Sequence, residues 1–295
     1  RLVAPTAVGA PDRAADAIAE VVGAALGEAG AGPADVAALG IGVPGRVDRD
    51  RGHVTLAVNL DWHDLPLGPR LEARLGIPTV LENDVRAAAL GLSRRRVFGE
   101  VESLALLAVG TGISAGVVID GRLHRGSLGL AGEIGHAVID PGGPRCACGM
   151  TGCFEAVAAG PAIAARAGTP DAESAFAAAA AGDPRALAVV DETGRAVAWG
   201  VHLLALAYDV DRIVIGGGVS HAGEPFIAPV IRELDRFRVA SPLAREILVP
   251  GLVQLLPPGA DAGAWGAVTI AREYLSDVAG ELSSADAPRR EVGHA

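Results

Sequence analysis

The sequence predicts an α/β fold that is large enough for two lobes. Short apolar runs with the length of buried strands alternate with longer amphipathic runs through most of the 295 residues, as expected for strands connected by helices. The first part of the chain is richer in predicted strands and the second part in predicted helices, and a cysteine-containing loop lies between them. Half of the residues are hydrophobic, which is enough to build a core in each lobe.

We assign residues 1–97 to an N-terminal α/β lobe. Its first helix is expected over 14–29, where apolar residues recur at helical spacing and Asp12 is a suitable N-cap. A second, shorter helix is expected over 67–75. The other predicted elements are strands over 36–43, 53–58 and 78–81, a turn at Pro44 and Gly45, a loop over 59–62, and an alanine-rich helix from 82 to about 98.

Residues 98–281 are assigned to a C-terminal α/β lobe that contains the cysteine loop, residues 132–155. Strands over 104–109 and 115–119 open this lobe, and Asp120-Gly121 has the composition of a tight hairpin turn. The elements after the cysteine loop are helices over 154–167, 171–181, 185–208, 223–238 and 262–278, and strands over 212–215, 246–249 and 252–256. Residues 282–295 are polar and aperiodic, so we expect them to be a disordered tail.

The cysteine loop contains a complete set of zinc ligands. All three cysteines of the protein, Cys146, Cys148 and Cys153, fall within eight residues of one another, and His136 precedes them. Isolated core cysteines are the alternative, but these three lie among glycines and prolines, where no core helix or strand is expected. Three thiolates and one imidazole predict a structural Zn²⁺ site without an open coordination position.

Two glutamates, Glu133 and Glu155, lie at the ends of the same loop. Exposed glutamates are usually solvated and need no further explanation. Here each lies two or three residues from a predicted zinc ligand, so the metal would hold both carboxylates in place. Rigid carboxylates are suited to the recognition of sugar hydroxyls.

Asn83 and Asp84 follow a predicted strand and open a helix. In open α/β sheets this is where ligands bind, and Asn83 could orient a hydroxyl group while Asp84 accepts its proton. The alternative is a helix N-cap, because Asn and Asp are preferred capping residues. The two roles are compatible.

Two glycine-containing loops predict a nucleotide site. Gly110, Thr111 and Gly112 join two strands, and a second loop, Gly216, Gly217 and Gly218, follows another apolar strand. A plain hairpin turn is the alternative for the first loop. Glycines allow backbone N–H groups to approach a phosphate closely. Neither loop is a Walker motif, because the chain contains no lysine.

These residues together resemble the ROK family (repressors, open reading frames, kinases), which are sugar kinases of the actin-like ATPase (ribonuclease H-like) superfamily. The resemblance extends from the turn at 42–45 to residues 263–266, and its most specific parts are 132–136 and 146–155. It implies a two-lobed actin-like fold with a zinc-bearing loop, ATP with Mg²⁺ as cofactors, and a homodimer or homotetramer.

The resemblance also implies a role for each candidate residue. Asp84 would be the general base for a sugar hydroxyl that attacks the γ-phosphate of ATP. The residues implied in holding the sugar are Asn83, Glu133, His136, Glu155 and the backbone near Gly45. His136 would serve zinc with one ring nitrogen and the sugar with the other. Gly110, Thr111 and Gly112 would face the phosphates, and Gly216, Gly217 and Gly218 the adenosine.

The sequence departs from the family pattern in two places. Ser114 stands where the family usually has glycine. The Asp-x-Gly-Gly-Thr loop that grips ATP in family kinases does not occur before Asp12, and residues 1–3 resemble the third strand of the N-terminal sheet. We therefore expect that a segment with about two strands and this loop precedes Arg1, and that the chain from Arg1 onward binds ATP poorly.

The resemblance implies an ATP-dependent hexose kinase, and glucose is the first candidate substrate. Alternatives are a kinase for another hexose or an N-acylated amino sugar, the sugar-sensing part of a ROK-type transcriptional repressor, and a sugar-binding protein without activity. Because 35 acidic residues outnumber 25 basic ones, giving a net charge of −10, no general nucleic-acid surface is expected. No apolar run has the length of a membrane span and no signal peptide is recognised, so we expect a cytoplasmic location.

Overall fold

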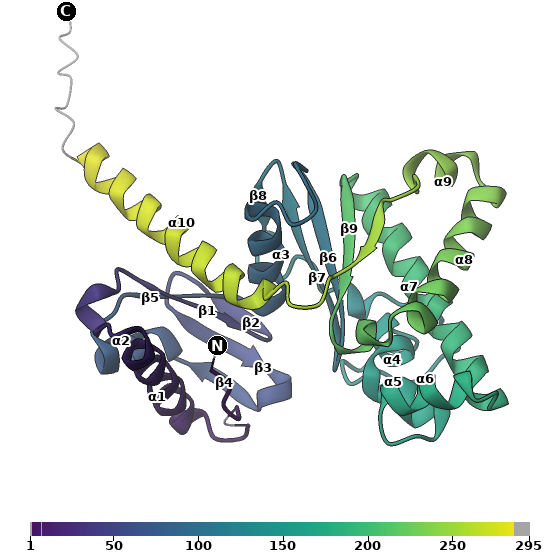
Figure 1. Ribbon diagram of the computed structural model, residues 1–295, viewed down its shortest axis with the longest axis horizontal. Helices are drawn as coiled ribbons and strands as arrows, with labels where there is room; N and C mark the ends of the chain where they lie inside the picture. The colour runs from purple at the N-terminus through teal and green to yellow at the C-terminus, as the bar shows by residue number, and fades with distance from the viewer. Residues whose placement is uncertain (1, 7, 286–295) are drawn as a thin grey trace, which may run out of the picture. The chain divides into compact units, whose positions relative to one another are not determined.

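A computed structural model of the protein describes residues 2–6 and 8–285, and it divides into two compact units. The first unit consists of the chain up to Ala87 together with the C-terminal helix from Ala264, and the second is Ala88–Gly263. The boundary between the units therefore follows Ala87, inside helix α3 (Asp84–Arg94), ten residues before the lobe boundary predicted at residue 97. Figure 1 labels the elements of both units.

The C-terminal helix belongs to the first unit, although the sequence analysis assigned its residues up to 281 to the second lobe. This helix, α10 (Ala262–Ala285), lies directly against strand β1 (Leu39–Val43). A Cβ atom added to Gly40 of β1 would lie only 1.9 Å from the carbonyl oxygen of Ala267. A contact so close requires glycine at position 40.

The first unit contains two small sheets. Strand β1 pairs in parallel with β5 (Thr79–Asn83), in a register that places Val43 beside Asn83. The other sheet is antiparallel and consists of β2 (Arg46–Asp48), β3 (His53–Ala57) and β4 (Trp62–Leu65). Helices α1 (Pro11–Ala29) and α2 (Leu67–Leu75) contribute apolar side chains to a core shared with both sheets.

Three expectations for this unit are wrong. Helix α1 begins at Pro11 and its N-cap is Ala10, so Asp12 lies in the first turn and pairs with Arg70 at 3.0 Å instead of capping. Strand β4 forms partly where a loop was expected, because Trp62 and Leu65 are buried while the two residues between them are exposed. Of residues 1–3, compared above with a sheet strand, residue 1 lies outside the described residues, and residues 2 and 3 have no regular secondary structure.

The second unit is built on one five-stranded sheet with strand order β10-β9-β6-β7-β8. The strands are β6 (Leu104–Val109), β7 (Ile113–Ile119), β8 (Arg122–His124), β9 (Arg212–Gly216) and β10 (Val253–Leu255). Strand β9 runs parallel to both β6 and β10, whereas β7 is antiparallel to its neighbours. The tight turn expected at Asp120-Gly121 is confirmed, since it joins β7 to β8.

Helices cover one face of this sheet and share a single apolar core with it (Figure 1). They are α4 (Phe154–Ala158), α5 (Gly160–Ala167), α6 (Ala172–Ala180), α7 (Pro184–Tyr208), α8 (Glu224–Ala240) and α9 (Pro242–Ile247). Short 3₁₀ helices occur over Pro33–Asp35, Val58–Leu60, Ile134–His136 and Gly218–Ala222.

Three expectations for the second half of the chain are also wrong. The helix expected over 154–167 is two helices, because Ala159 is extended and Pro161 lies in the first turn of the next helix, which begins at Gly160. The strand expected over 246–249 overlaps helix α9, whose N-cap Ser241 accepts a hydrogen bond from the N–H of Ala244. Helix α10 continues to Ala285, four residues into the expected tail, and residues 286–295 of that tail lie outside the described residues.

None of the helices in the described ranges combines the length and the apolar character that a membrane-spanning helix requires.

Candidate functional site

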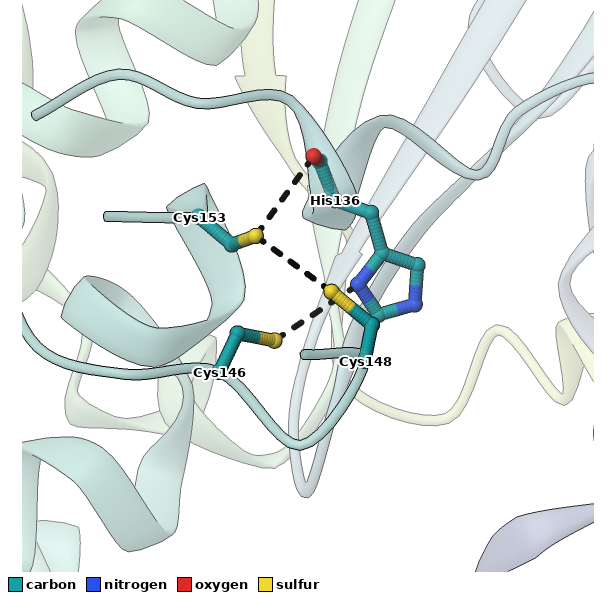
Figure 2. Close-up of side chains that lie close together, drawn as sticks. All are labelled: His136, Cys146, Cys148 and Cys153. Atoms are coloured by element: carbon teal, nitrogen blue, oxygen red, sulfur yellow. Dashed lines mark hydrogen bonds between the residues drawn. The ribbon is translucent and has the colours of Figure 1, made fainter. Parts of the chain in front are cut away.

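Four side chains with metal-ligating atoms converge in the loop before α4: His136, Cys146, Cys148 and Cys153. Their ligand atoms all lie within 4.8 Å of one another. Nδ1 of His136 lies 3.8 Å from Sγ of Cys146, and Sγ of Cys148 lies 3.6 Å from Sγ of Cys153 (Figure 2). Three sulfurs and one imidazole nitrogen are the ligand set of a closed tetrahedral zinc site. The cluster could therefore hold one metal ion as the sequence predicts.

Backbone contacts bring these ligands together although the loop is irregular. Isolated β-bridges join Val138 to Cys153 and Arg145 to Thr151. Between them Gly152 has φ +77°, and a Cβ added there would lie 1.5 Å from the carbonyl oxygen of Asp140. The chain can therefore turn back on itself at this point only with glycine, and that turn places Cys153 at the start of α4.

Two cysteines of this cluster, Cys153 and Cys148, differ in their environment. Cys153 is fully buried, and burial raises the pKa of its thiol to about 12. Cys148 is exposed, and the hydrogen bond from the backbone N–H of Met150 lowers its thiol pKa. At neutral pH a metal ion must therefore displace a proton from Cys153 to bind it as a thiolate.

His136 and Glu133 lie in one short 3₁₀ turn, where the N–H of His136 donates to the carbonyl oxygen of Glu133 at 3.2 Å. Nδ1 of His136 faces the sulfurs, so its other ring nitrogen, Nε2, points away from them (Figure 2). Gly132 anchors the turn on β7, because its carbonyl accepts a 2.7 Å hydrogen bond from the N–H of Ala115. The turn thus places Glu133 three residues from His136, whose Nε2 is turned away from the cluster.

Glu155 lies in the first turn of α4, and its side chain contacts the loop between β6 and β7. Oε2 accepts a 2.8 Å hydrogen bond from the N–H of Ile113. The same oxygen would lie 2.7 Å from a Cβ atom added to Gly112. The structure therefore brings a residue predicted to bind sugar next to the loop predicted to bind phosphate. It also shows that the amide of Ile113 is already occupied by a carboxylate.

The two glycine loops meet at the ends of neighbouring parallel strands. Ala108 of β6 pairs with Gly216 of β9, so both loops leave the sheet at the carboxyl ends of these two parallel strands. Gly217 has φ +89°, and a Cβ added there would lie 2.4 Å from the carbonyl oxygen of Val109. The N–H of Gly160 donates to the carbonyl oxygen of Gly110 at 2.7 Å. The carboxyl ends of parallel strands are where α/β proteins bind ligands.

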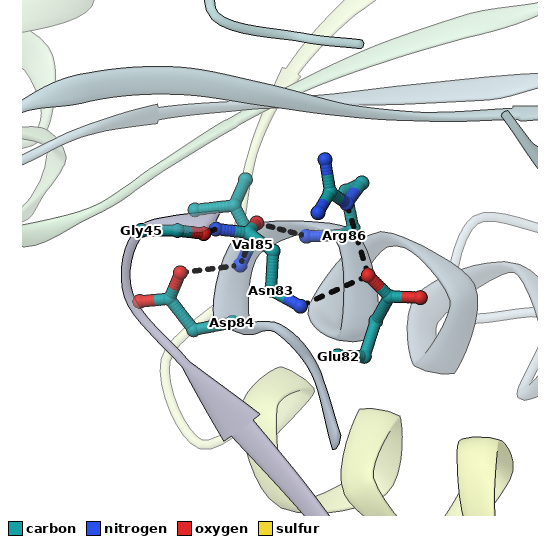
Figure 3. A network of polar contacts seen from close by, with 6 residues as sticks. All are labelled: Gly45, Glu82, Asn83, Asp84, Val85 and Arg86. Carbon is teal, nitrogen blue, oxygen red and sulfur yellow. Dashed lines mark hydrogen bonds and ion pairs between the residues drawn. The ribbon is translucent and has the colours of Figure 1, made fainter. Parts of the chain in front are cut away.

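In the first unit, Asn83 is the N-cap of α3. Its Oδ1 accepts hydrogen bonds from the N–H groups of Val85 at 3.1 Å and Arg86 at 3.0 Å. Its Nδ2 donates to the carbonyl oxygen of Gly45 at 3.2 Å (Figure 3). The capping role considered from the sequence thus falls on Asn83, and its amide also links the strand end to the turn at Gly45.

Asp84, the next residue, is half-buried at the first position of α3. Its Oδ1 accepts a 2.9 Å hydrogen bond from the N–H of Val85. Burial raises the pKa of the Asp84 carboxyl, while this hydrogen bond and the charge of Arg86 oppose the rise by favouring the ionised form. A carboxylate with a raised pKa, at the carboxyl end of a parallel strand, is suited to accept a proton.

Two residues beside Asp84 were not among the residues predicted from the sequence. Glu82 and Arg86 form an ion pair between Nε and Oε1 at 3.0 Å, and their side chains are only 4% and 3% exposed (Figure 3). A glutamate and an arginine four residues apart are the only trace of this pair in the sequence, and such pairs are usually exposed.

The candidate residues are thus distributed over both units. Gly45, Asn83 and Asp84 belong to the first unit, and the cysteine cluster, Glu133, Glu155 and both glycine loops belong to the second.

Comparisons with known proteins agree on one family. A profile of the ROK family matches residues 6–274. A glucokinase from Thermotoga maritima is 37% identical over 265 residues, which cover 80% of this chain and 80% of that protein. The crystal structure of a ROK hexokinase from Thermus thermophilus superimposes with a TM-score of 0.73 at 34% identity, covering 94% of this chain and 90% of that one.

A third solved structure adds ligands to the comparison. It is a ROK family glucokinase from Streptomyces griseus in complex with glucose and AMPPNP, with a TM-score of 0.70 and 32% identity over 92% of this chain and 90% of that chain. Shorter matches include an N-acetylmannosamine kinase from Citrobacter koseri, 41% identical over 56% of this chain and 58% of that protein. A xylose repressor from Caldicellulosiruptor bescii is 40% identical over 42% of this chain and 31% of that protein.

Proposed function

The chain belongs to the ROK family, and from this premise we propose that it is an ATP-dependent sugar kinase that phosphorylates a hexose, with glucose as the first candidate substrate and glucose 6-phosphate as the product. Its α/β fold is then the two-lobed, actin-like ATPase fold expected from the sequence. The substrate is proposed as glucose because two glucokinases and a hexokinase at 34–37% identity each match at least 80% of the chain.

The observation that carries the proposal is the position of Asp84. The proposed reaction needs a base that takes the proton of a sugar hydroxyl while the oxygen attacks the γ-phosphate of ATP. Asp84 lies at the carboxyl end of β5, and the N–H of Val85 fixes one of its carboxylate oxygens. We propose that it accepts the proton, and that Asn83 holds it in place by capping the same helix.

The sugar would be held mainly by the turn beside the cysteine cluster. Glu133 and Nε2 of His136 would receive sugar hydroxyls, with Glu155, Asn83 and the backbone of Gly45 as further proposed contacts. The structure restricts two of these contacts. Oδ1 of Asn83 already accepts two hydrogen bonds and one N–H of its amide donates to Gly45, so the second N–H of the amide is the group left for a ligand. Oε2 of Glu155 already accepts from Ile113, so its other oxygen would serve the sugar.

We propose Zn²⁺ as the ion of the cluster formed by His136, Cys146, Cys148 and Cys153, in a structural role. With four protein ligands the ion has no open position for substrate. Its contribution would be to hold Glu133 and His136 in fixed positions relative to the start of α4.

ATP with Mg²⁺ is the proposed phosphoryl donor. The loop of Gly110, Thr111 and Gly112 would face the phosphates, and Gly216, Gly217 and Gly218 the adenosine. This assignment is supported by the position of both loops at the carboxyl ends of neighbouring parallel strands. Because Glu155 occupies the amide of Ile113 and the N–H of Gly110 donates to the carbonyl oxygen of Gly112 at 2.9 Å, we expect phosphate contacts at Thr111, in the middle of this loop.

Two alternatives keep the same site. The match with an N-acetylmannosamine kinase favours an N-acylated amino sugar as substrate. The match with a xylose repressor favours a sugar-sensing role, in which the proposed base would have no function. We further propose a cytoplasmic location, because a thiolate cluster is stable in a reducing compartment. A homodimer or homotetramer is proposed on the resemblance to the family alone. Sedimentation of the full-length protein tests the oligomeric state.

The deciding experiment measures ADP release by the full-length, zinc-loaded protein with ATP, Mg²⁺ and each of glucose, mannose, fructose and N-acetylmannosamine. We expect glucose to have the highest kcat/KM. Turnover with N-acetylmannosamine alone would establish the amino-sugar alternative. Sugar binding in calorimetry without any turnover would favour the sensor and contradict the kinase proposal.

A further inference from the structure

The ion pair of Glu82 and Arg86 encloses the segment that carries Asp84. Glu82 is the fourth residue of β5 and Arg86 lies in the first turn of α3, so the pair spans the junction of strand and helix. Both side chains are almost inaccessible to solvent, at 4% and 3%. Charges buried to this degree are costly unless they are paired and hydrogen-bonded. A salt bridge at this position is therefore expected to have a role beyond general stability.

One oxygen of Glu82 accepts hydrogen bonds from both sides of the junction, one from the backbone of the strand end and one from a side chain of the helix. Oε1 accepts from Nε of Arg86 at 3.0 Å and from the backbone N–H of Asn83 at 2.9 Å (Figure 3). The pair thereby fastens the two ends of a five-residue segment, and Asn83 and Asp84 lie inside it. The neighbouring strand closes the other side, since a Cβ added to Gly42 would lie 3.2 Å from Cα of Asp84.

We propose that Glu82 and Arg86 are a positioning pair for Asp84: by fastening the 82–86 segment they hold its carboxylate in the orientation needed to accept a proton. The proposal rests on the proposed function, in which Asp84 is the base. Neither residue needs to touch a substrate, since both act through the backbone of the junction and the cap of α3.

The pair also supplies the positive charge that acts on Asp84. Burial disfavours the ionised carboxylate, and Arg86 is the charged side chain whose field favours it. Loss of this charge would raise the pKa of Asp84 further. An exposed arginine without this geometry would have little effect on the carboxylate, because water screens it.

Three variants of the full-length protein test the proposal: Arg86→Met, Arg86→Lys, and the double variant Glu82→Gln with Arg86→Met. Methionine keeps the length of the side chain without its charge, and lysine keeps the charge. The double variant removes both charges of the pair, and its glutamine retains an oxygen for the N–H of Asn83. Arg74→Met is the matched control, because Arg74 pairs with Asp16 in the same unit but is 54% exposed.

We expect Arg86→Met to lower kcat on the order of 10- to 100-fold with little change in the KM for hexose. The acidic limb of its kcat profile should move to higher pH, and Arg86→Lys should recover most of the rate. The double variant should regain thermal stability without regaining kcat. Arg74→Met should leave kcat and its pH dependence unchanged.

Two measurements are independent of turnover. In the sugar-free protein, carbon-13 NMR should show the Asp84 carboxyl titrating at higher pH in Arg86→Met than in the wild type. Hydrogen exchange should be faster at the N–H groups of Val85 and residue 86, which Asn83 caps. Should Arg86→Met not fold, the double variant supplies the same comparisons.

The proposal is overturned if the rate recovers together with stability in the double variant, because the pair would then be merely structural. It is equally overturned if the Asp84 titration and both exchange rates match the wild type. A wild-type protein that phosphorylates no sugar would reject the proposed function instead, and the NMR measurements would still decide whether the pair positions Asp84.

Discussion

The two units present functional carboxylates in different ways. In the first, Asp84 is held by regular secondary structure, by the cap from Asn83 and by the buried pair of Glu82 and Arg86. In the second, Glu133 lies in an irregular loop close to the cluster of His136, Cys146, Cys148 and Cys153, which could hold a metal ion. Cys153 would have to lose its proton to bind that ion as a thiolate. The chain alone thus preforms the position of the proposed catalytic base, whereas we propose that the sugar contacts of the second unit, Glu133 and His136, depend on the proposed Zn²⁺.

The largest expected effect comes from removing the base while leaving its support intact. Asp84→Asn should lower kcat by about 10³-fold, the usual contribution of a positioned base, with hexose affinity retained. Its melting temperature should rise. The folded-state pKa of Asp84 is raised, so the stability linked to its protonation is lost as pH rises through that pKa. At neutral pH the wild type therefore carries the cost of a buried charge, which the neutral asparagine avoids.

Steady-state kinetics, calorimetry of hexose binding and thermal unfolding would check this prediction. A substitution that left kcat unchanged would show that Asp84 is not the base, and would remove the contrast between the two units.

Removing the metal should affect the second unit and spare the first. We expect chelation to lower hexose affinity on the order of tenfold or more and to destabilise the loop before α4. Affinity for zinc should rise with pH, because the ion must displace the proton of Cys153, whose pKa is raised to about 12. Calorimetry with and without chelator measures the sugar affinity, and added zinc should restore it.

Unchanged hexose affinity in the metal-free protein would contradict the proposed role of the cluster. Cys153→Ser is the genetic counterpart of chelation, and hydrogen exchange of the first unit should be the same with and without metal.

A smaller effect is expected from the cap of α3. Asn83→Ala should cost about 1 kcal/mol of unfolding free energy and should also lower kcat, because Asp84 follows it directly. Asp183→Ala is the matched control, since Asp183 caps α7 of the second unit by accepting from the N–H of Ala186 at 2.8 Å. The control should lose similar stability without losing rate. Equal losses of rate in both variants would argue against a specific role for the junction.

The smallest effect concerns pH. The base works only when ionised, so kcat/KM should fall as pH decreases through the folded-state pKa of Asp84. Because burial raises this pKa, the fall should begin above the value of about 3.9 for an ordinary aspartate. A pH–rate profile, with circular dichroism to confirm the fold at each pH, tests this. A limb at or below the ordinary value would contradict the assignment.

Local patterns predicted much of the site, and long-range packing accounts for the rest. The cysteine cluster could be predicted because its ligands are close in sequence, and Asp84 because it follows an apolar strand. The pair of Glu82 and Arg86 could not, since a sequence does not show that a charged residue is buried. The return of α10 to the first unit was also invisible, because it depends on the contact between Gly40 and Ala267 across more than two hundred residues.

Cys153 is both a proposed zinc ligand and the first residue before α4, and Glu155 lies two residues further along. One bond to the metal would therefore couple the supply of a trace element to carbon metabolism. In a cell short of zinc, the protein would then have its proposed base in place but a disorganised proposed sugar site. Sugar phosphorylation would then fall without any change in the expression of the gene.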